Sequence, residues 1–259
     1  MACIRRSSAG LLVARSDYIT STVPLFPILQ LLPENELMGV RRLASYKPTF
    51  TVEGWLTLAA NPSVQARIAA DPYSRAYPAL LAHFQSRRPL SFDDALVGLH
   101  VVYGWMPTIP DLQRSMSDAI DRQALVDLLR RVQAGHVPTV AEMKTVAEFV
   151  NNSSIGGSKL LHFLNPAGCP IWDRRVARVM VRDSIGYDMI KLPDAWHAYT
   201  TTITPWLSDA RVQAQVRVLG RLCGPASHLS GCTPLRLVEL VLFHASEPEP
   251  RKSRRPEDS

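Results

Sequence analysis

Residues 150–182 read VNNSSIGGSKLLHFLNPAGCPIWDRRVARVMVR and decide how this chain is organised. The residues before this stretch follow a helical pattern that continues to Val150. Residues 151–157 are predicted to form a turn, because two adjacent glycines permit positive φ angles and close approach of the backbone. A second helix is predicted over residues 159–164. The stretch therefore predicts two helices joined by a glycine turn.

The segments on both sides of this stretch also follow helical patterns. Pro62, Ser91 and Thr139 each stand before apolar residues that recur every three or four positions, as is typical of helix N-termini. The clearest amphipathic pattern covers residues 118–133. Further helices are expected at 193–199, 205–222 and 234–244, and residues 185–190 are compatible with a short extended piece. Strand-like alternation is nearly absent, so the sequence predicts an all-α protein with about ten short helices.

Composition and charge limit the classes of function. With 259 residues, 46% apolar and 20% charged, the chain can form a folded globular protein, and nothing approaches a transmembrane span. The formal net charge of +6 favours an anionic partner such as nucleic acid, although a basic small-molecule enzyme would fit as well. The cysteines have neither zinc nor iron–sulfur spacing, so no metal and no cofactor is predicted. Reduced thiols indicate a cytoplasmic protein.

Two parts of the central stretch suggest contacts with a phosphate backbone. The N–H groups at the start of the 159–164 helix could bind a phosphate, although a plain helix–helix turn would look the same. Asp173 opens a basic helix on which Arg174, Arg178 and Arg182 share a face. The alternative is that Asp173 only caps this helix and the arginines form a solvated surface. The candidate DNA-binding residues are Gly156, Gly157, Ser158, Arg174, Arg175 and Arg178.

The combination of these two parts resembles a known family. Pro170-Ile171-Trp172-Asp173, followed by Val176, Arg178, Val179 and Met180, resembles the aspartate segment of the helix-hairpin-helix DNA glycosylase superfamily. That superfamily contains endonuclease III, the adenine glycosylase and 8-oxoguanine DNA glycosylase. Upstream, Gly157-Ser158-Lys159 resembles the end of the family hairpin, where bifunctional members carry a nucleophilic lysine.

The chain departs from the family pattern at two places. The family hairpin usually reads Leu-Pro-Gly-Val-Gly, whereas residues 153–157 read Ser-Ser-Ile-Gly-Gly. The separation between Lys159 and Asp173 is also shorter than usual by about one helical turn. These departures suggest an outlying branch, and one such branch resembles an anti-phage glycosylase that removes glucosylated hydroxymethylcytosine from phage DNA. No residue here indicates a sugar-bearing base.

The resemblance implies a fold, a partner and an activity. The expected fold has two packed helical subdomains, a helix-hairpin-helix and a cleft between the subdomains, within residues 49–245. Residues 1–48 would pack on this core, and residues 246–259 would form a disordered tail. The protein would act as a monomer on double-stranded DNA, extrude a damaged or modified base and cleave its N-glycosidic bond, leaving an abasic site.

The resemblance also assigns roles to individual residues. Asp173 would stabilise the oxocarbenium-like sugar and orient a water molecule. Lys159, if neutral, could form a Schiff base with the sugar. Aromatic and polar side chains beside this pair, and at a helix break predicted at Gly104, could build the pocket for the base; each could equally be an ordinary core residue. The candidate pocket residues are Tyr103, Trp105, His162 and Trp172.

Two other functions stay open from the sequence. A non-catalytic DNA-binding protein could use the same hairpin and basic helix. A small-molecule enzyme or an all-α interaction protein would carry the same composition but would have no salt-dependent affinity for DNA. The two DNA-binding hypotheses differ in what they require of Asp173.

Overall fold

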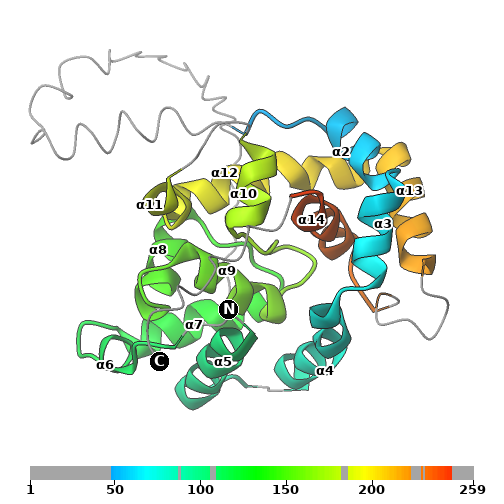
Figure 1. Cartoon of the computed structure of the whole chain (residues 1–259). Coiled ribbons are helices and arrows are strands. Elements are labelled where there is room, and N and C mark those ends of the chain that lie inside the picture. Colours follow the sequence, from blue (N-terminus) through cyan, green and yellow to red (C-terminus); the bar gives the residue numbers. More distant parts are fainter. Residues whose placement is uncertain are drawn as a thin grey trace, which may run out of the picture. The chain divides into compact units, whose positions relative to one another are not determined.

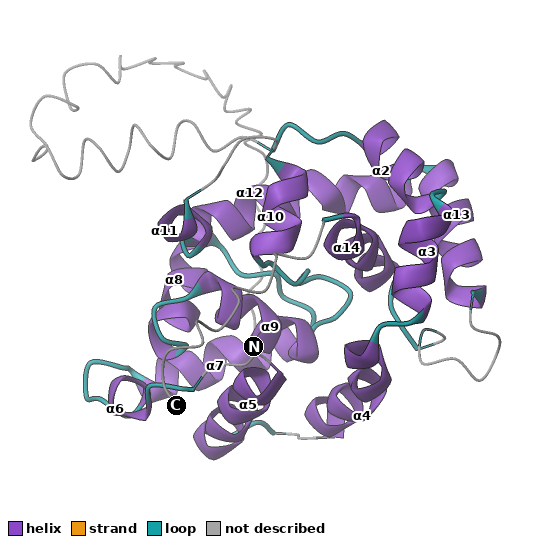
Figure 2. Ribbon diagram, in the orientation of Figure 1, coloured by secondary structure: helices purple, strands orange, loops and turns teal. Residues whose placement is uncertain are grey.

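Polar capping residues divide the chain into short helices. The computed structural model describes residues 48–86, 89–105, 109–181, 186–222, 229 and 231–246. Over these residues it contains thirteen α-helices, one 3-10 helix and no strand, so the all-α prediction is confirmed (Figures 1 and 2). The helices are α2 (Val52–Ala59), α3 (Pro62–Ala69), α4 (Pro72–Ser86), α5 (Phe92–Trp105), α6 (Leu112–Ser115), α7 (Arg122–Gln133), α8 (Val140–Phe149), α9 (Ser154–Leu164), α10 (Arg174–Met180), α11 (Tyr187–Ile190), α12 (Pro193–Ile203), η2 (Thr204–Ser208), α13 (Ala210–Arg221) and α14 (Pro234–Ala245).

Helix α14 lies at the centre of one group of helices. Nine of its twelve residues are buried, and they occupy every side of the helix. A helix without a solvated face has to be surrounded by other elements. Helices α2, α3, α10 and α13 all pack against α14, which Figure 1 shows between them. The indole Nε1 of Trp55 on α2 donates a hydrogen bond of 3.0 Å to the carbonyl oxygen of Val238, so α2 is tied to this centre by a polar contact as well.

Helix α9 lies at the centre of a second group. It packs against α4, α5, α7, α8 and α12, and nine of its eleven residues are buried. Its small N-terminal residues let α8 come close. A Cβ atom at Gly157 would lie 3.3 Å from both Met143 Cε and Val146 Cγ1, which is tighter than ordinary van der Waals contact. Gly157 therefore has a packing role between α8 and α9.

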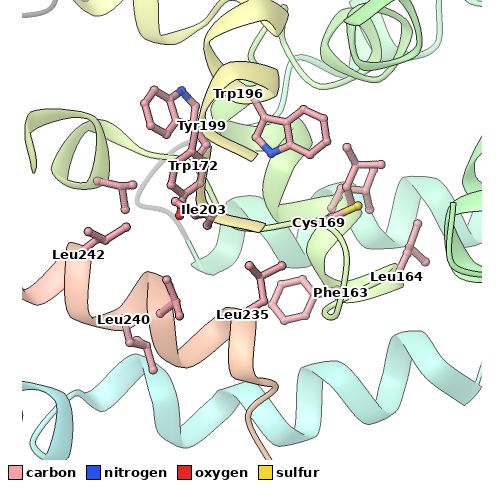
Figure 3. Packing of buried hydrophobic residues seen from close by; sticks show 14 of the residues in the cluster. Phe163, Leu164, Cys169, Trp172, Trp196, Tyr199, Ile203, Leu235, Leu240 and Leu242 are labelled. Atoms are coloured by element: carbon pink, nitrogen blue, oxygen red, sulfur yellow. The ribbon is translucent and has the colours of Figure 1, made fainter. Parts of the chain in front are cut away.

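The segment that leads from α9 to α10 is fixed by hydrogen bonds to buried tryptophans. Trp196 Nε1 donates to the carbonyl oxygen of Pro170 at 3.0 Å, and Trp172 Nε1 donates to that of Ile190 at 2.8 Å. The Trp172 ring lies 5.0 Å from the Tyr199 ring. Figure 3 shows these aromatic side chains in one cluster with Leu240 and Leu242 of α14. The residue that follows, Asp173, is therefore held in place from both groups of helices.

The predicted glycine turn between α8 and α9 is wrong. Residues 150–153 connect the two helices, and Asn151 and Asn152 adopt positive φ angles of 53° and 51°. Asparagine tolerates this left-handed conformation better than most residues, because its short side chain can hydrogen-bond locally. Gly156 and Gly157 lie inside α9 and are buried. The asparagines, rather than the glycines, make the turn.

Two other local predictions are also corrected. Residues 187–190 form the short helix α11, where the sequence left room for an extended piece. Helix α5 continues through Gly104 and ends at Trp105, within the interruption predicted from Gly104 to Pro107, and residues 106–108 lie outside the described residues. The amphipathic helix predicted from residue 118 begins at Arg122, because the Asp121 side chain caps it there.

All described residues fall within one compact unit, Leu43–Ser259. The predicted N-terminal segment and tail lie outside the described residues, except for Pro48 and Ser246 at their edges. Within the described ranges, no helix is both long and apolar enough to cross a membrane.

Candidate active site

A cavity of about 270 Å³ opens where elements of both helical groups meet. Helices α9, α10 and α14 contribute its charged side chains, and the start of α4 and the end of α5 contribute aromatic rings. The lining residues are Asp71, Tyr73, Trp105, Lys159, Ile171, Asp173, Arg175, Arg236, Glu239 and Phe243. The cavity thus contains three carboxylates, three cations and three aromatic rings.

Asp173 is positioned by its own helix and by the backbone of the residue before it. Its Oδ1 accepts a hydrogen bond of 2.9 Å from the N–H of Val176, which makes Asp173 the N-cap of α10. The N–H of Trp172 donates to Ser158 Oγ at 3.0 Å, which fixes the preceding peptide against α9. No residue in the described ranges donates a hydrogen bond to Asp173 Oδ2. One carboxylate oxygen therefore holds the helix, and the other is available to a ligand.

Lys159 brings an unpaired amine to the same cavity. Its side chain is half-buried, and its Nζ forms neither a hydrogen bond nor an ion pair with any described residue. Burial lowers the pKa of Lys159 below its ordinary value, and the nearby Arg236 guanidinium acts in the same direction, whereas Asp173 and Glu239 oppose this change. The pKa is lowered on balance, so the neutral, nucleophilic form of this amine is more accessible than that of a surface lysine.

Arg236 and Glu239 form a buried ion pair in the wall of the cavity. They stand three residues apart on α14 with side chains only 5% and 1% exposed, and Arg236 Nη1 lies 2.5 Å from both Glu239 carboxylate oxygens. Burial raises the pKa of Glu239 above its ordinary value, although Arg236 opposes this. Burial alone would lower the pKa of Arg236, but Glu239 raises it, so the guanidinium stays charged.

Aromatic rings hold the Arg236 guanidinium and line the cavity. The guanidinium carbon lies 5.2 Å from the centre of the Tyr77 ring and 5.5 Å from that of Trp105. Tyr73 meets Trp105 edge to face at 6.5 Å, and its own side chain is 51% exposed. Because Tyr73 is half in solvent and still lines the cavity, it stands at the mouth.

Asp71 fixes the start of α4 beside this mouth. Its side chain accepts hydrogen bonds from the Tyr73 N–H at 3.1 Å and the Ser74 hydroxyl at 2.6 Å, and His244 Nε2 lies 3.6 Å away. Burial by itself would raise the pKa of Asp71, but His244 and these hydrogen bonds lower it to about 2. Asp71 is therefore a carboxylate at neutral pH, and its oxygens are already used to position Tyr73.

Comparison with models of protein families, with curated proteins and with solved structures finds no match to this chain. Among the described residues, no group of three or more His, Cys, Asp or Glu side chains is placed to hold a metal ion.

The candidate DNA-binding residues differ in their exposure to solvent. Arg174 and Arg178 are exposed on α10, whereas Arg175 turns toward the cavity. The Arg175 guanidinium lies over the Phe243 ring at 4.3 Å and donates to the carbonyl oxygen of Ser246. Gly156, Gly157 and Ser158 are buried inside α9. In the turn between α8 and α9, Asn152 is exposed.

Of the four pocket candidates, Trp105 lines the cavity and the other three lie in the core. Tyr103 and Trp172 are 4% and 0% exposed and are absent from the cavity wall. His162 is fully buried, and its two ring nitrogens lie 2.9 Å from the Tyr77 hydroxyl and 2.7 Å from the carbonyl oxygen of Cys169. Burial lowers the pKa of His162 to about 3, so it is neutral at physiological pH.

Sequence reasoning missed half of the cavity wall. Asp71, Tyr73, Arg236, Glu239 and Phe243 were not singled out. For Arg236 and Glu239 a signal was present, since a cation and a carboxylate three residues apart interrupt the otherwise apolar segment 234–243. Charged residues inside an apolar helix are buried only when they are paired, and such pairs are frequent at functional sites.

Proposed function

We propose that this protein is a DNA glycosylase that extrudes a damaged or modified base from double-stranded DNA and cleaves its N-glycosidic bond. The observation that carries the proposal is the convergence of two unpaired groups, Asp173 Oδ2 and Lys159 Nζ, on one cavity lined by aromatic rings. In the same proposal, the α9 and α14 groups are the two subdomains of a glycosylase, α8 and α9 form its helix-hairpin-helix, and the cavity is its cleft.

The cavity suits a single base. Its volume of about 270 Å³ is close to the lower end of the range of small-molecule pockets, which is suitable for one planar ring system. The glycosidic bond is unreachable inside the duplex, and the base has to leave the stack to enter such a pocket. Trp105 and Phe243 would contact its ring. A glucosyl group on the base would have to remain at the mouth beside Tyr73.

The reaction would separate charge, and Asp173 is placed to stabilise the positive part. When the C1′–N bond breaks, its electron pair leaves with the base and the sugar gains oxocarbenium character. A carboxylate beside C1′ stabilises that cation and can orient a water molecule, which adds to C1′ and loses a proton. The fixed Oδ2 of Asp173 meets this requirement without reorganisation, because Oδ1 is held by the Val176 N–H.

Lys159 offers a second route from the same cavity. Its neutral amine could displace the base from C1′ in place of water, with the electron pair of the C1′–N bond leaving on the base. Loss of a proton from the amine and cleavage of the C1′–O4′ bond would then give a Schiff base, from which the strand can be cleaved by β-elimination. The lowered pKa and the missing ion pair both support this route.

The outer surface supports DNA as the partner. The formal net charge is +6, and the exposed arginines Arg174 and Arg178 lie on α10 directly after Asp173. Arginines beside the catalytic aspartate would contact phosphates that flank the extruded nucleotide. Such contacts release counterions, so affinity for the duplex should fall steeply with salt.

Asp173→Asn tests the assigned mechanism. Duplexes with a panel of modified bases would be incubated with the protein and the released bases identified by mass. The variant should release no base yet bind the duplex nearly as well, because asparagine is also a good N-cap and keeps α10 intact. Asp121→Asn is the matched control, since Asp121 caps α7 away from the cavity. Base release by Asp173→Asn at the normal rate would show that the mechanism is wrong. Salt-dependent duplex binding without release from any substrate would favour a non-catalytic DNA-binding protein.

Borohydride trapping tests the Lys159 route. Wild-type protein should form a covalent adduct with a cleavable duplex, and Lys159→Gln should form none. Lys144→Gln is the control, because Lys144 is exposed on α8. If the adduct persists in Lys159→Gln, another amine is the nucleophile; if wild type forms none, Lys159 acts only through its charge.

A further inference from the structure

Arg236 is an unusual residue to find in the wall of a cavity. It is 4% exposed, and its hydrogen bonds to described side chains go through one nitrogen, Nη1, to Glu239. Its Nε is buried without a hydrogen-bond partner among the described residues, and its Nη2 forms no hydrogen bond with them either. Buried donors without partners are costly and infrequent, so they require an explanation.

The neighbours of Arg236 hold its guanidinium in place, but they do not accept hydrogen bonds from all of its N–H groups. Glu239 holds one corner, and the rings of Tyr77 and Trp105 lie within 5.5 Å of the guanidinium carbon. Trp105 adds a second donor, Nε1, that is buried without a partner in the described part of the chain. Both side chains line the cavity that Lys159 and Asp173 share. Arg236 therefore brings to the cavity a fixed guanidinium that can only donate, and its Nη2 has no hydrogen-bond partner among the described residues.

We propose that Arg236 recognises a carbonyl oxygen of the extruded base and stabilises the negative charge that the base acquires as it leaves. This inference rests on the proposed function and names a substrate class for it. Adenine is the one DNA base without a carbonyl group, and its exocyclic amino group would place N–H opposite N–H. Pyrimidines and keto-purines carry a carbonyl oxygen that can accept a hydrogen bond from the Arg236 guanidinium.

The role in the reaction follows from where the charge develops. The electron pair of the broken C1′–N bond stays on the base and is delocalised onto its carbonyl oxygens. A fixed charged donor that contacts that oxygen would stabilise the transition state more than the ground state. Asp173 would thus match the cationic sugar and Arg236 the anionic base, and Glu239 and Trp105 would act on Arg236 as positioning residues.

Binding to a matched pair of duplexes tests recognition separately from catalysis. The two duplexes carry hypoxanthine or adenine at one position; hypoxanthine has a carbonyl in place of the 6-amino group and a hydrogen on N1. Protein with Asp173→Asn, in which release is blocked, should bind the hypoxanthine duplex about tenfold to a hundredfold more tightly, as expected for one charge-assisted hydrogen bond. Adding Arg236→Met with Glu239→Gln, which removes both buried charges, should reduce that preference to less than about twofold.

Comparing the two proteins removes the contribution of base-pair strength, because it is the same in both. Arg236→Lys is a second variant that keeps the charge in case the double substitution fails to fold; it should also lose most of the preference, because lysine lacks the planar fork. Equal affinities for the two duplexes before Arg236 is changed, or a preference that survives its removal, would overturn the inference.

Leaving-group acidity provides the catalytic readout. On duplexes with uracil, 5-fluorouracil or 5-bromouracil, the rate of release by the Arg236 variants should depend more steeply on the acidity of the base than that of wild type. If the release rates of wild type and of the Arg236 variants depend equally on the acidity of the base, Arg236 does not stabilise the leaving base. If the protein prefers the hypoxanthine duplex but releases no base from any duplex, the glycosylase proposal is refuted and recognition by Arg236 stands. If it releases a base but shows no preference, recognition by Arg236 is refuted and the glycosylase proposal stands.

Discussion

His162 makes the stability of this protein depend on pH in a way that the structure specifies. The ring is fully buried, and burial lowers its pKa from 6.5 to about 3. The unfolded chain takes up a proton on this residue below about pH 6.5, whereas the folded protein keeps the ring neutral down to about pH 3. The stabilisation from the neutral ring is therefore fully present above pH 6.5 and is lost as the pH falls from there toward 3.

The expected magnitude follows from the width of that window. Each pH unit below 6.5 lowers the free energy of unfolding by about 1.4 kcal/mol, so the loss between pH 7 and pH 5 is about 2 kcal/mol from His162 alone. Over the whole window the loss approaches about 5 kcal/mol, which is a large part of the stability of a typical domain.

Urea unfolding at a series of pH values, followed by far-UV circular dichroism, measures this loss. Other groups, such as Asp71, also titrate as the pH falls, so the comparison is with His162→Gln, in which the buried position cannot be protonated. The variant will start less stable at pH 7, but its free energy of unfolding should fall by about 2 kcal/mol less than that of wild type by pH 5. Parallel curves for the two proteins would show that His162 binds a proton equally well in the folded and unfolded states, so that burial does not lower its pKa.

Two further predictions concern packing and the mouth of the cavity. Gly98→Ala should destabilise the protein by about 1–3 kcal/mol, because a Cβ there would lie 2.9 Å from the Phe84 ring. Gly104→Ala should instead stabilise it by up to about 1 kcal/mol, because no atom lies within 4 Å of the added Cβ and alanine favours the helix. Urea unfolding checks both, and a stable Gly98→Ala would contradict the packing at that site. Tyr73→Ala should weaken binding to a duplex with an extrudable base by about 1–3 kcal/mol through lost stacking. Tyr187→Ala, with the same 51% exposure, should have no effect, and equal losses in the two variants would argue against a role for Tyr73 at the mouth.

The residues proposed to act on the sugar and those proposed to act on the base come from different parts of the chain. The groups proposed to act on the sugar, Lys159 and Asp173, come from one continuous stretch, and Ser158 ties the two parts of it together through the Trp172 N–H. The groups proposed to act on the base come from α14, which is distant in sequence. Packing of α10 against α14 brings the two sets to one place.

The amino-acid sequence by itself determined the helical class and most helix starts. Both are local properties: a Thr, Asp or Pro before a 3.6-residue pattern specifies a helix N-terminus whatever the rest of the chain does. The sequence also singled out Asp173 and Lys159, because their types and order within 150–182 carry a family resemblance. The turn before α9 was predicted to include the two glycines, because glycine readily adopts positive φ angles, but Asn151 and Asn152 adopt these angles instead.

Only the tertiary structure decided which side chains share the cavity. Aromatic residues at helical spacing look the same whether they line a pocket or fill a core, so Trp105 could not be separated from Tyr103 or Trp172 before the packing was known. Arg236 and Glu239 reach the site through α14, and periodicity shows that a helix is buried but not what it faces. Burial and charge at a site are sums over neighbours from distant segments, and only the folded chain brings those neighbours together.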